Sequence, residues 1–279
     1  MRQKFIKINS DIRLSLYDFG GKGAPLIFCH FTGGLGLLWQ ITAELIKKDY
    51  HCFAYDARGH GDSSKPLDAR LYDWNEHLSD LIYLVNYIKD ITQSDIIYGV
   101  GHSFGGACLS QTVIHTQKIL NWKKIILIEP IVGPDKFDFQ RNNMSKVAEK
   151  RRGVFKSEEE LENLRNKYPY KDWREDVWKS FVKYGFYKDT DGRYFLKCSP
   201  KIESFQYLSS NPHSWFSNLK KIKIPVLIMY GENSYLLPLG YPQIKQIPSS
   251  YLIKIHEASH FVPQEKPEIV ANWIKKWFS

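Results

Sequence analysis

The sequence predicts an α/β fold in which helices flank a mostly parallel sheet and a helical insertion interrupts the chain. Two observations carry this prediction. Apolar runs of strand length alternate with helical patterns through the first half of the chain and again near its end. Between these parts lies a charged, aromatic-rich stretch without that alternation. Because alternating strands and helices form right-handed βαβ units, we expect one α/β core of residues 1–132 and 219–279, with residues 133–218 inserted.

The first elements can be followed in chain order. Two alternating segments, 4–8 and 12–18, flank the turn-forming residues 9–11 and predict an antiparallel pair. Continuous apolar runs bounded by turn signals then predict buried parallel strands. These strands are 26–30, 51–55, 96–100 and 124–128. The helices between them are 38–47, a segment capped by Asp73 that runs through Ile88, and 105–116.

The alternation breaks after Gly133 and resumes only at Ile224. In between, the sequence predicts helices with no strands separating them, over 144–155, 157–167 and 173–185. The core is completed by strands at 224–230 and 251–255 and by an amphipathic helix over 267–278. Such an insertion would sit at the carboxyl edge of the sheet, where α/β proteins form their sites.

Composition limits the function classes. The formal charge of +9 makes nucleic-acid binding a class to consider, but the lysines are spread among acidic residues. Non-specific phosphate binding needs a focused patch, so we expect no nucleic-acid partner. The apolar runs have strand length, and the N-terminal segment lacks the apolar core of a secretory signal. We therefore expect a cytoplasmic protein with no membrane partner. The four widely spaced cysteines favour free buried thiols over a disulfide or zinc site.

The strongest local signal is Gly101-His102-Ser103-Phe104-Gly105, which follows a predicted strand and precedes a predicted helix. This context is that of a nucleophile elbow, a turn so tight that glycine is needed two positions before and after the serine. The turn lifts the Ser103 hydroxyl clear of the sheet, and the next helix points its N-terminus at a developing anion. Ser103 is therefore the candidate nucleophile.

Together with three further segments, this motif resembles the α/β-hydrolase superfamily. Residues 30–34 are similar to the oxyanion loop of that family, and residues 56–64 to its D-x-R-G-x-G-x-S loop. Residues 259–261 are similar to the segment that carries the catalytic histidine. These matches cover nearly the whole chain outside the insertion, which itself resembles the helical cap of many members. The resemblance implies the α/β-hydrolase fold and a serine-hydrolase mechanism.

A serine hydroxyl is a poor nucleophile at neutral pH, so a base must take its proton. Histidine suits this role because its pKa lies near the working pH. Of the nine histidines, His260 is the predicted base, because it follows the last strand in the chain order serine, acid, histidine. By resemblance, the backbone N–H groups of Thr32 and Phe104 form the oxyanion hole. Three other histidines near these motifs are interpreted as structural: His30, His60 and His102.

The acid of the triad is where this sequence departs from the family pattern. The usual acid follows the seventh strand, where this chain has Gly231-Glu232-Asn233-Ser234 and so a serine at the acid position. Glu129, after the sixth strand, is the preferred candidate, since haloalkane dehalogenases of this superfamily place their acid there. A buried carboxylate also needs a partner, which His260 would supply. Two alternatives stay open: Glu232 is the acid, or no carboxylate fills this role and Glu129 binds loop N–H groups or Arg58 instead.

The sequence thus predicts a serine hydrolase that cleaves an ester, thioester or similar acyl bond of a small, largely apolar molecule. This mechanism needs neither a metal nor an organic cofactor. Epoxide hydrolase and dehalogenase chemistry is disfavoured, because those relatives have aspartate at the nucleophile position. Two other functions remain open on the same fold: carbon–carbon bond hydrolysis of the meta-cleavage type, and non-catalytic ligand binding.

Overall fold

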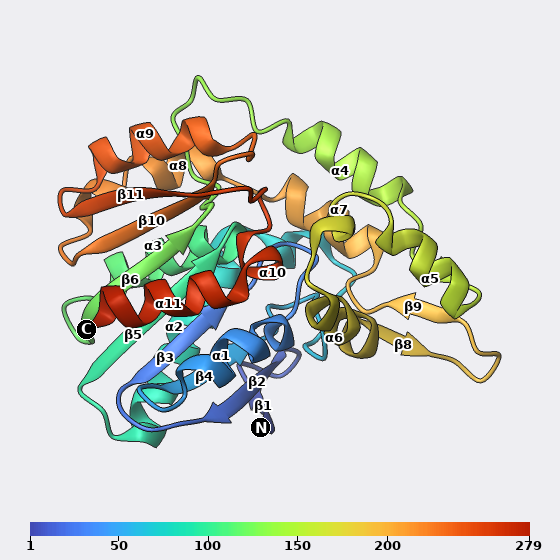
Figure 1. The fold of residues 1–279 in the computed structure, drawn as a ribbon, viewed down its shortest axis with the longest axis horizontal. Helices are drawn as coiled ribbons and strands as arrows, with labels where there is room; N and C mark the ends of the chain where they lie inside the picture. Colours follow the sequence, from blue (N-terminus) through green and yellow to red (C-terminus); the bar gives the residue numbers. More distant parts are fainter.

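An eight-stranded sheet forms the centre of the structure (Figure 1). Its strands are β1 (Arg2–Lys7), β2 (Arg13–Gly20), β3 (Pro25–Cys29), β4 (His51–Tyr55), β5 (Ile96–His102), β6 (Asn121–Ile128), β10 (Val226–Gly231) and β11 (Ser250–Ile255). Their order is β1-β2-β4-β3-β5-β6-β10-β11; β2 is antiparallel to both neighbours, and all pairs from β4 to β11 are parallel. This computed structural model describes the backbone of residues 1–279 and every side chain except that of Arg141.

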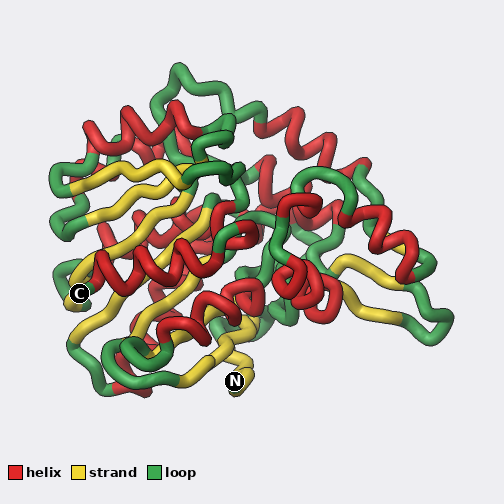
Figure 2. The backbone as a smooth tube through the Cα atoms, in the orientation of Figure 1, coloured by secondary structure: helices red, strands yellow, loops and turns green.

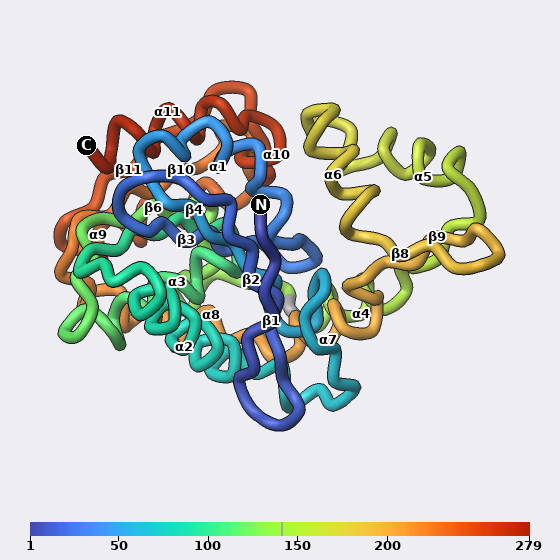
Figure 3. The backbone as a smooth tube through the Cα atoms, turned by 90° about the horizontal axis from the view of Figure 1, so that it is seen from below, coloured from blue at the N-terminus to red at the C-terminus, as the bar shows by residue number. Residues whose placement is uncertain are grey.

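Helices cover both faces of the sheet (Figures 2 and 3). One face packs against α1 (Gln40–Ile46) and α11 (Pro267–Phe278), and the other against α2 (Trp74–Thr92), α3 (Phe104–Thr116) and α9 (Leu237–Gln246). In β3, Leu26 and Phe28 belong to the first of these two cores, whereas Ile27 and Cys29 belong to the second. Central strands are therefore buried on both sides, which explains their unbroken apolar runs.

The predicted fold class is confirmed, and α11 begins and ends at the predicted residues. The predicted core strands also correspond to observed ones, with boundary differences of a few residues. Helix α9 was not predicted, because it contains Pro238, Gly240 and Pro242, which are poor helix formers. Its formation depends on packing instead: Leu239 is fully buried against the second core.

The inserted segment, residues 133–218, is not purely helical, so the expectation of helices without strands was wrong. It contains helices α4 (Arg141–Lys150), α5 (Glu158–Arg165), α6 (Glu175–Gly185), α7 (Pro200–Leu208) and α8 (Pro212–Phe216). It also contains a small antiparallel sheet of β7 (Val154–Phe155), β8 (Phe186–Lys188) and β9 (Tyr194–Leu196). Strands of two or three residues are too short to show a period of two in the sequence. The helix predicted over 144–155 ends early, because Arg151 has an extended backbone (ψ 153°).

The inserted segment lies beside the carboxyl ends of the core strands (Figure 1). Its helix α6 contacts the 3₁₀ helix η1 (Gly36–Trp39), which follows β3, and α7 contacts the 3₁₀ helix η2 (Ala69–Tyr72), which follows β4. The segment thus meets the edge of the sheet at which α/β proteins form their sites. Among the residues that the structure describes, no helix has the length and apolar character needed to cross a bilayer.

A buried ion pair joins the loop after β4 to helix α2. The guanidinium of Arg58 donates to both carboxylate oxygens of Asp80, at 2.7 and 2.8 Å. Only 2% of the Arg58 side chain and 1% of the Asp80 side chain are exposed. Arg58 also donates to the carbonyl of Leu71 at 2.8 Å and to Glu76 at 3.1 Å, although 47% of the Glu76 side chain is exposed. Arg58 therefore organises this loop.

We expect Asp80→Asn to lower the free energy of unfolding by about 3 kcal/mol, because it leaves the buried Arg58 cation without its main counter-ion. Glu76→Gln, which removes an exposed carboxylate from the same guanidinium, should cost less than about 1 kcal/mol. Urea unfolding of both variants measures the difference. Equal losses would show that burial does not determine the strength of these two contacts.

Candidate active site

Ser103 lies at a sharp turn between β5 and α3, with backbone angles φ 56° and ψ −118°. A Cβ atom on Gly101 would lie 2.6 Å from the carbonyl oxygen of Gly105, and one on Gly105 would lie 2.5 Å from that of Cys29. Both distances are shorter than any real contact, so the turn excludes every residue but glycine at these positions. The strain at Ser103 places its hydroxyl at the N-terminus of α3, as in a nucleophile elbow.

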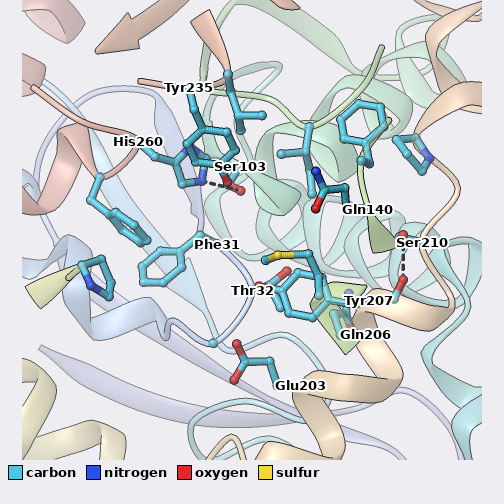
Figure 4. Close-up of a pocket in the computed structure, with 18 of the residues that line it drawn as sticks. Phe31, Thr32, Ser103, Gln140, Glu203, Gln206, Tyr207, Ser210, Tyr235 and His260 are labelled. Carbon is cyan, nitrogen blue, oxygen red and sulfur yellow. Dashed lines mark hydrogen bonds between the residues drawn. The ribbon is translucent and has the colours of Figure 1, made fainter. Parts of the chain in front are cut away.

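His260 and Glu129 approach Ser103 from two other loops, after β11 and β6. The Nε2 atom of His260 lies 3.0 Å from Ser103 Oγ (Figure 4), and its Nδ1 atom lies 3.0 Å from Oε2 of Glu129. With the Nδ1 proton directed at the carboxylate, Nε2 is free to accept the Ser103 O–H. The structure therefore joins these three residues in one chain of hydrogen bonds.

Glu129 is fully buried and has two further hydrogen-bond donors. The Gly231 N–H donates to Oε1 at 2.6 Å, and the Ser234 hydroxyl donates to Oε2 at 2.6 Å. Ser234 occupies the position of the usual family acid, and here its hydroxyl binds the carboxylate of Glu129. These contacts satisfy both oxygens of a charge whose burial would otherwise be costly.

The other partners considered for this site lie elsewhere. Glu232 is exposed and forms an ion pair with His256 at 2.7 Å, away from His260. This hydrogen bond holds the pKa of Glu232 below its usual range. Arg58 binds Asp80 rather than Glu129. Of the two candidate carboxylates, the structure thus brings Glu129 to His260.

Three neighbouring histidines have structural contacts. Burial lowers the pKa of His102 and of His60 well below the ordinary value, so both rings are neutral. His102 Nε2 lies 2.8 Å from the backbone carbonyl of His260 and supports that loop. His60 accepts from Gly33 N–H at 2.9 Å, and His30 accepts from Ala57 N–H at 3.0 Å. The sequence did not reveal the contact between His102 and the His260 loop, because 158 positions separate the two residues.

The loop that contains Thr32 forms a tight turn beside Ser103. Gly34 N–H donates to the Phe31 carbonyl at 2.9 Å, and Gly33 has a φ of 86°, as the third position of a type II turn requires. The large Phe31 ring does not disturb this turn, because it packs edge-on against Phe261 at 5.2 Å between ring centroids. In the described chain, no residue accepts the Thr32 N–H.

The second predicted donor to an oxyanion is the Phe104 N–H. Phe104 opens α3, and the first N–H groups of a helix have no acceptor within it. Both Thr32 and Ser103 line one cavity of about 490 Å³ (Figure 4). Residues from the core loops and from the inserted segment share this lining. Its aromatic members include Phe31, Phe139, Tyr168, Phe181 and Phe261, and its polar members include Gln140, Arg151, Glu203, Gln206 and Tyr207.

Comparison with known proteins identifies the family. The chain matches the model of the alpha/beta hydrolase family over residues 26–273. The protein belongs to the α/β-hydrolase family. Among solved structures, this hydrolase is similar to E-2-(acetamidomethylene)succinate hydrolase, with a TM-score of 0.82 and 19% identity over 99% of this chain and 98% of that one. It is also similar to the thioesterase domain from the curacin biosynthetic pathway, with a TM-score of 0.81 and 18% identity over 99% of each chain.

Relatives in sequence span several activities. The hydrolase is 25% identical to protein phosphatase methylesterase 1 of Kluyveromyces lactis, over 88% of this chain but only 65% of that relative. It is 25% identical to non-heme chloroperoxidase CPO-A1 of Kitasatospora aureofaciens, over 87% of this chain and 86% of that one. Family membership therefore fixes the fold, while the reaction has to be inferred from the site.

Proposed function

We propose that this α/β-hydrolase is a serine hydrolase that cleaves an ester, thioester or similar acyl bond through an acyl-enzyme on Ser103. The observation that carries the proposal is the chain of two 3.0 Å hydrogen bonds from Ser103 Oγ through His260 to Glu129. A nucleophile, a base and a buried acid in this order form the arrangement that activates a serine hydroxyl. An ester-cleaving relative and a thioesterase neighbour support the same reaction class.

In the proposed reaction, Ser103 Oγ attacks the acyl carbon while its proton passes to His260 Nε2. The backbone N–H groups of Thr32 and Phe104 hold the negative charge that develops on the carbonyl oxygen. Glu129 accepts the Nδ1–H and stabilises the imidazolium. His260 then gives the proton to the leaving group as the acyl bond breaks. A water molecule, activated by the same histidine, releases the carboxylic acid and restores the Ser103 hydroxyl.

We further propose that the inserted segment acts as a cap over this site. Its residues Tyr168 and Phe181 line the same cavity as Ser103 and His260. A cavity of about 490 Å³ has the size of a small-molecule site. Aromatic side chains beside the nucleophile would bind an apolar part of the substrate and limit access of bulk water to the acyl-enzyme.

Replacement of the nucleophile tests the reaction class. We expect Ser103→Ala to lower kcat for short p-nitrophenyl esters by about 10⁶-fold, because triad serines contribute on this scale. The exposed Ser214→Ala is the matched control and should retain full activity. Labelling by a fluorophosphonate probe should likewise occur in the control and be absent in the variant. An unlabelled wild-type protein that hydrolyses no ester would instead point to non-catalytic ligand binding.

The two candidate acids form a matched pair for mutation. Glu129→Gln should lower kcat by about 10⁴-fold, because the amide cannot stabilise the imidazolium of His260. Glu232→Gln should leave kcat nearly unchanged, since Glu232 binds the exposed His256. Steady-state ester hydrolysis compares the two. A reversed ranking would assign the acid to the segment after β10.

Ser234 is proposed as a positioning residue for Glu129. Ser234→Ala removes one of three donors to the buried carboxylate and should lower kcat by about tenfold while KM stays unchanged. Ser234→Thr keeps the hydroxyl and should restore kcat. If the alanine variant changes KM but not kcat, Ser234 shapes the cavity and does not act through Glu129.

A further inference from the structure

A polar cluster from the inserted segment lies in the cavity that Ser103 opens onto. Arg151 follows α4, and its NH1 atom lies 2.9 Å from Oε2 of Glu203 on α7. Only 8% of the Glu203 side chain is exposed. Glu203, Gln206 and Tyr207 share one face of α7 at helical spacing, and Figure 4 shows them on the cavity wall across from His260.

The Arg151 guanidinium has more donors than its neighbours use. Glu203 and Tyr170 lie against this guanidinium and take up only part of its five N–H groups, while 27% of the side chain is exposed. Gln206 also lines the cavity, and its amide faces His77.

Glu203 is the counter-charge of this arginine. Burial raises the pKa of Glu203, and the Arg151 cation opposes that rise. Its Oε1 atom lies 3.6 Å from the point where a Cβ on Gly33 would stand, next to the loop that contains Thr32. The ion pair therefore lies near the reacting centre. Both members also line a second cavity of about 440 Å³, so the pair stands where the two cavities meet.

Stability does not explain this cluster. A buried ion pair often contributes less than apolar residues of the same volume, because both charges lose their hydration. In a substrate cavity, charged and polar side chains of this kind bind and orient a ligand.

The character of that ligand follows from the charges. Arg151 and Glu203 together carry no net charge, so a second carboxylate would lie beside Glu203 and be repelled. Arg151 is 27% exposed and offers only N–H donors, so it binds an acceptor oxygen, and Gln206 adds a polar side chain to the same wall. An uncharged group with an acceptor oxygen, such as a carboxamide, meets these requirements, whereas an alkyl end would displace water from the ion pair without giving it a hydrogen bond.

We propose that Arg151, Glu203 and Gln206 form a specificity subsite for an uncharged polar group, such as a carboxamide, at one end of the substrate. The proposal rests on the proposed acyl hydrolysis at Ser103. It also refines the substrate class: the molecule has an apolar part against the aromatic wall and a polar end at Arg151, rather than being apolar throughout.

A series of p-nitrophenyl esters tests this subsite. The acyl chains differ in length and end in a methyl, a carboxamide or a carboxylate group. At the best-fitting length, wild-type kcat/KM for the carboxamide should exceed that for both other ends by about tenfold, because only the carboxamide offers Arg151 an acceptor oxygen without added charge. Equal values for the three ends, or a preference for the carboxylate, would overturn the proposal.

Two substitutions separate the charges of the pair. Glu203→Gln leaves the Arg151 cation unbalanced and should shift the preference from carboxamide to carboxylate by about tenfold or more. Arg151→Met should abolish the preference for the carboxamide over the methyl end. Glu175→Gln is the matched control, because Glu175 pairs with Arg165 on the surface of the same segment. If Glu203→Gln retains its fold, as thermal unfolding reports, and the preference does not shift, the subsite is wrong.

A binding measurement keeps this test independent of catalysis. Isothermal titration calorimetry of Ser103→Ala with hexanamide and with hexanoate should show tighter binding of the amide. Adding Glu203→Gln should reverse that order. If no ester is hydrolysed but the amide still binds more tightly, the acyl-hydrolase proposal fails and the subsite stands. If esters are hydrolysed by Ser103 but neither order is observed, the subsite fails and the hydrolase stands.

Discussion

The arrangement around Ser103 depends on one buried charge, the carboxylate of Glu129. It lies at the carboxyl end of β6, fully buried, in a backbone conformation with φ 52°. Three donors surround it: the N–H of Gly231 at the end of β10, the Ser234 hydroxyl in the loop that follows, and Nδ1 of His260 after β11. An unpaired carboxylate at this depth would be costly, so these contacts stabilise the buried charge. Together they hold the loops after β6, β10 and β11 in fixed positions relative to one another.

The fixed position of these loops also sets the orientation of the candidate base, His260. His260 is held at its ring by Glu129 and at its backbone carbonyl by His102, which lies next to Ser103 in the elbow. The turn that contains Ser103 therefore both presents its hydroxyl and supports the loop of the candidate base. Sites of this kind need such a rigid frame, since small misplacements of the reacting groups are costly in rate.

The sequence predicted the parts of this frame that have local signals. The core strands have continuous apolar runs, and the elbow has glycines in the positions where a side chain would collide. Glu129 was preferred because some members of the superfamily place their acid after the same strand and because a buried carboxylate needs a partner. The sequence could not predict the pairing of Arg151 with Glu203, because 52 positions separate the two residues and nothing in either segment marks them as partners. The short strands β7, β8 and β9 were not predicted for a related reason: they depend on packing and show no periodic pattern in the sequence.

Sheet geometry explains how a carboxylate after β6 can serve in place of one after β10. Strands β6 and β10 are parallel neighbours, with Ile128 beside Met229, so the residues after them meet at the same edge. A carboxylate after either strand can therefore reach the same Nδ1 of His260. When the acid is on β6, the position after β10 is still next to it and faces the same charge. A serine there carries a hydroxyl that can donate to such an acid, which is the contact that Ser234 makes with Glu129. The serine at the usual acid position and the candidate acid after β6 are thus joined directly, so the two departures from the family pattern lie within one hydrogen bond of each other.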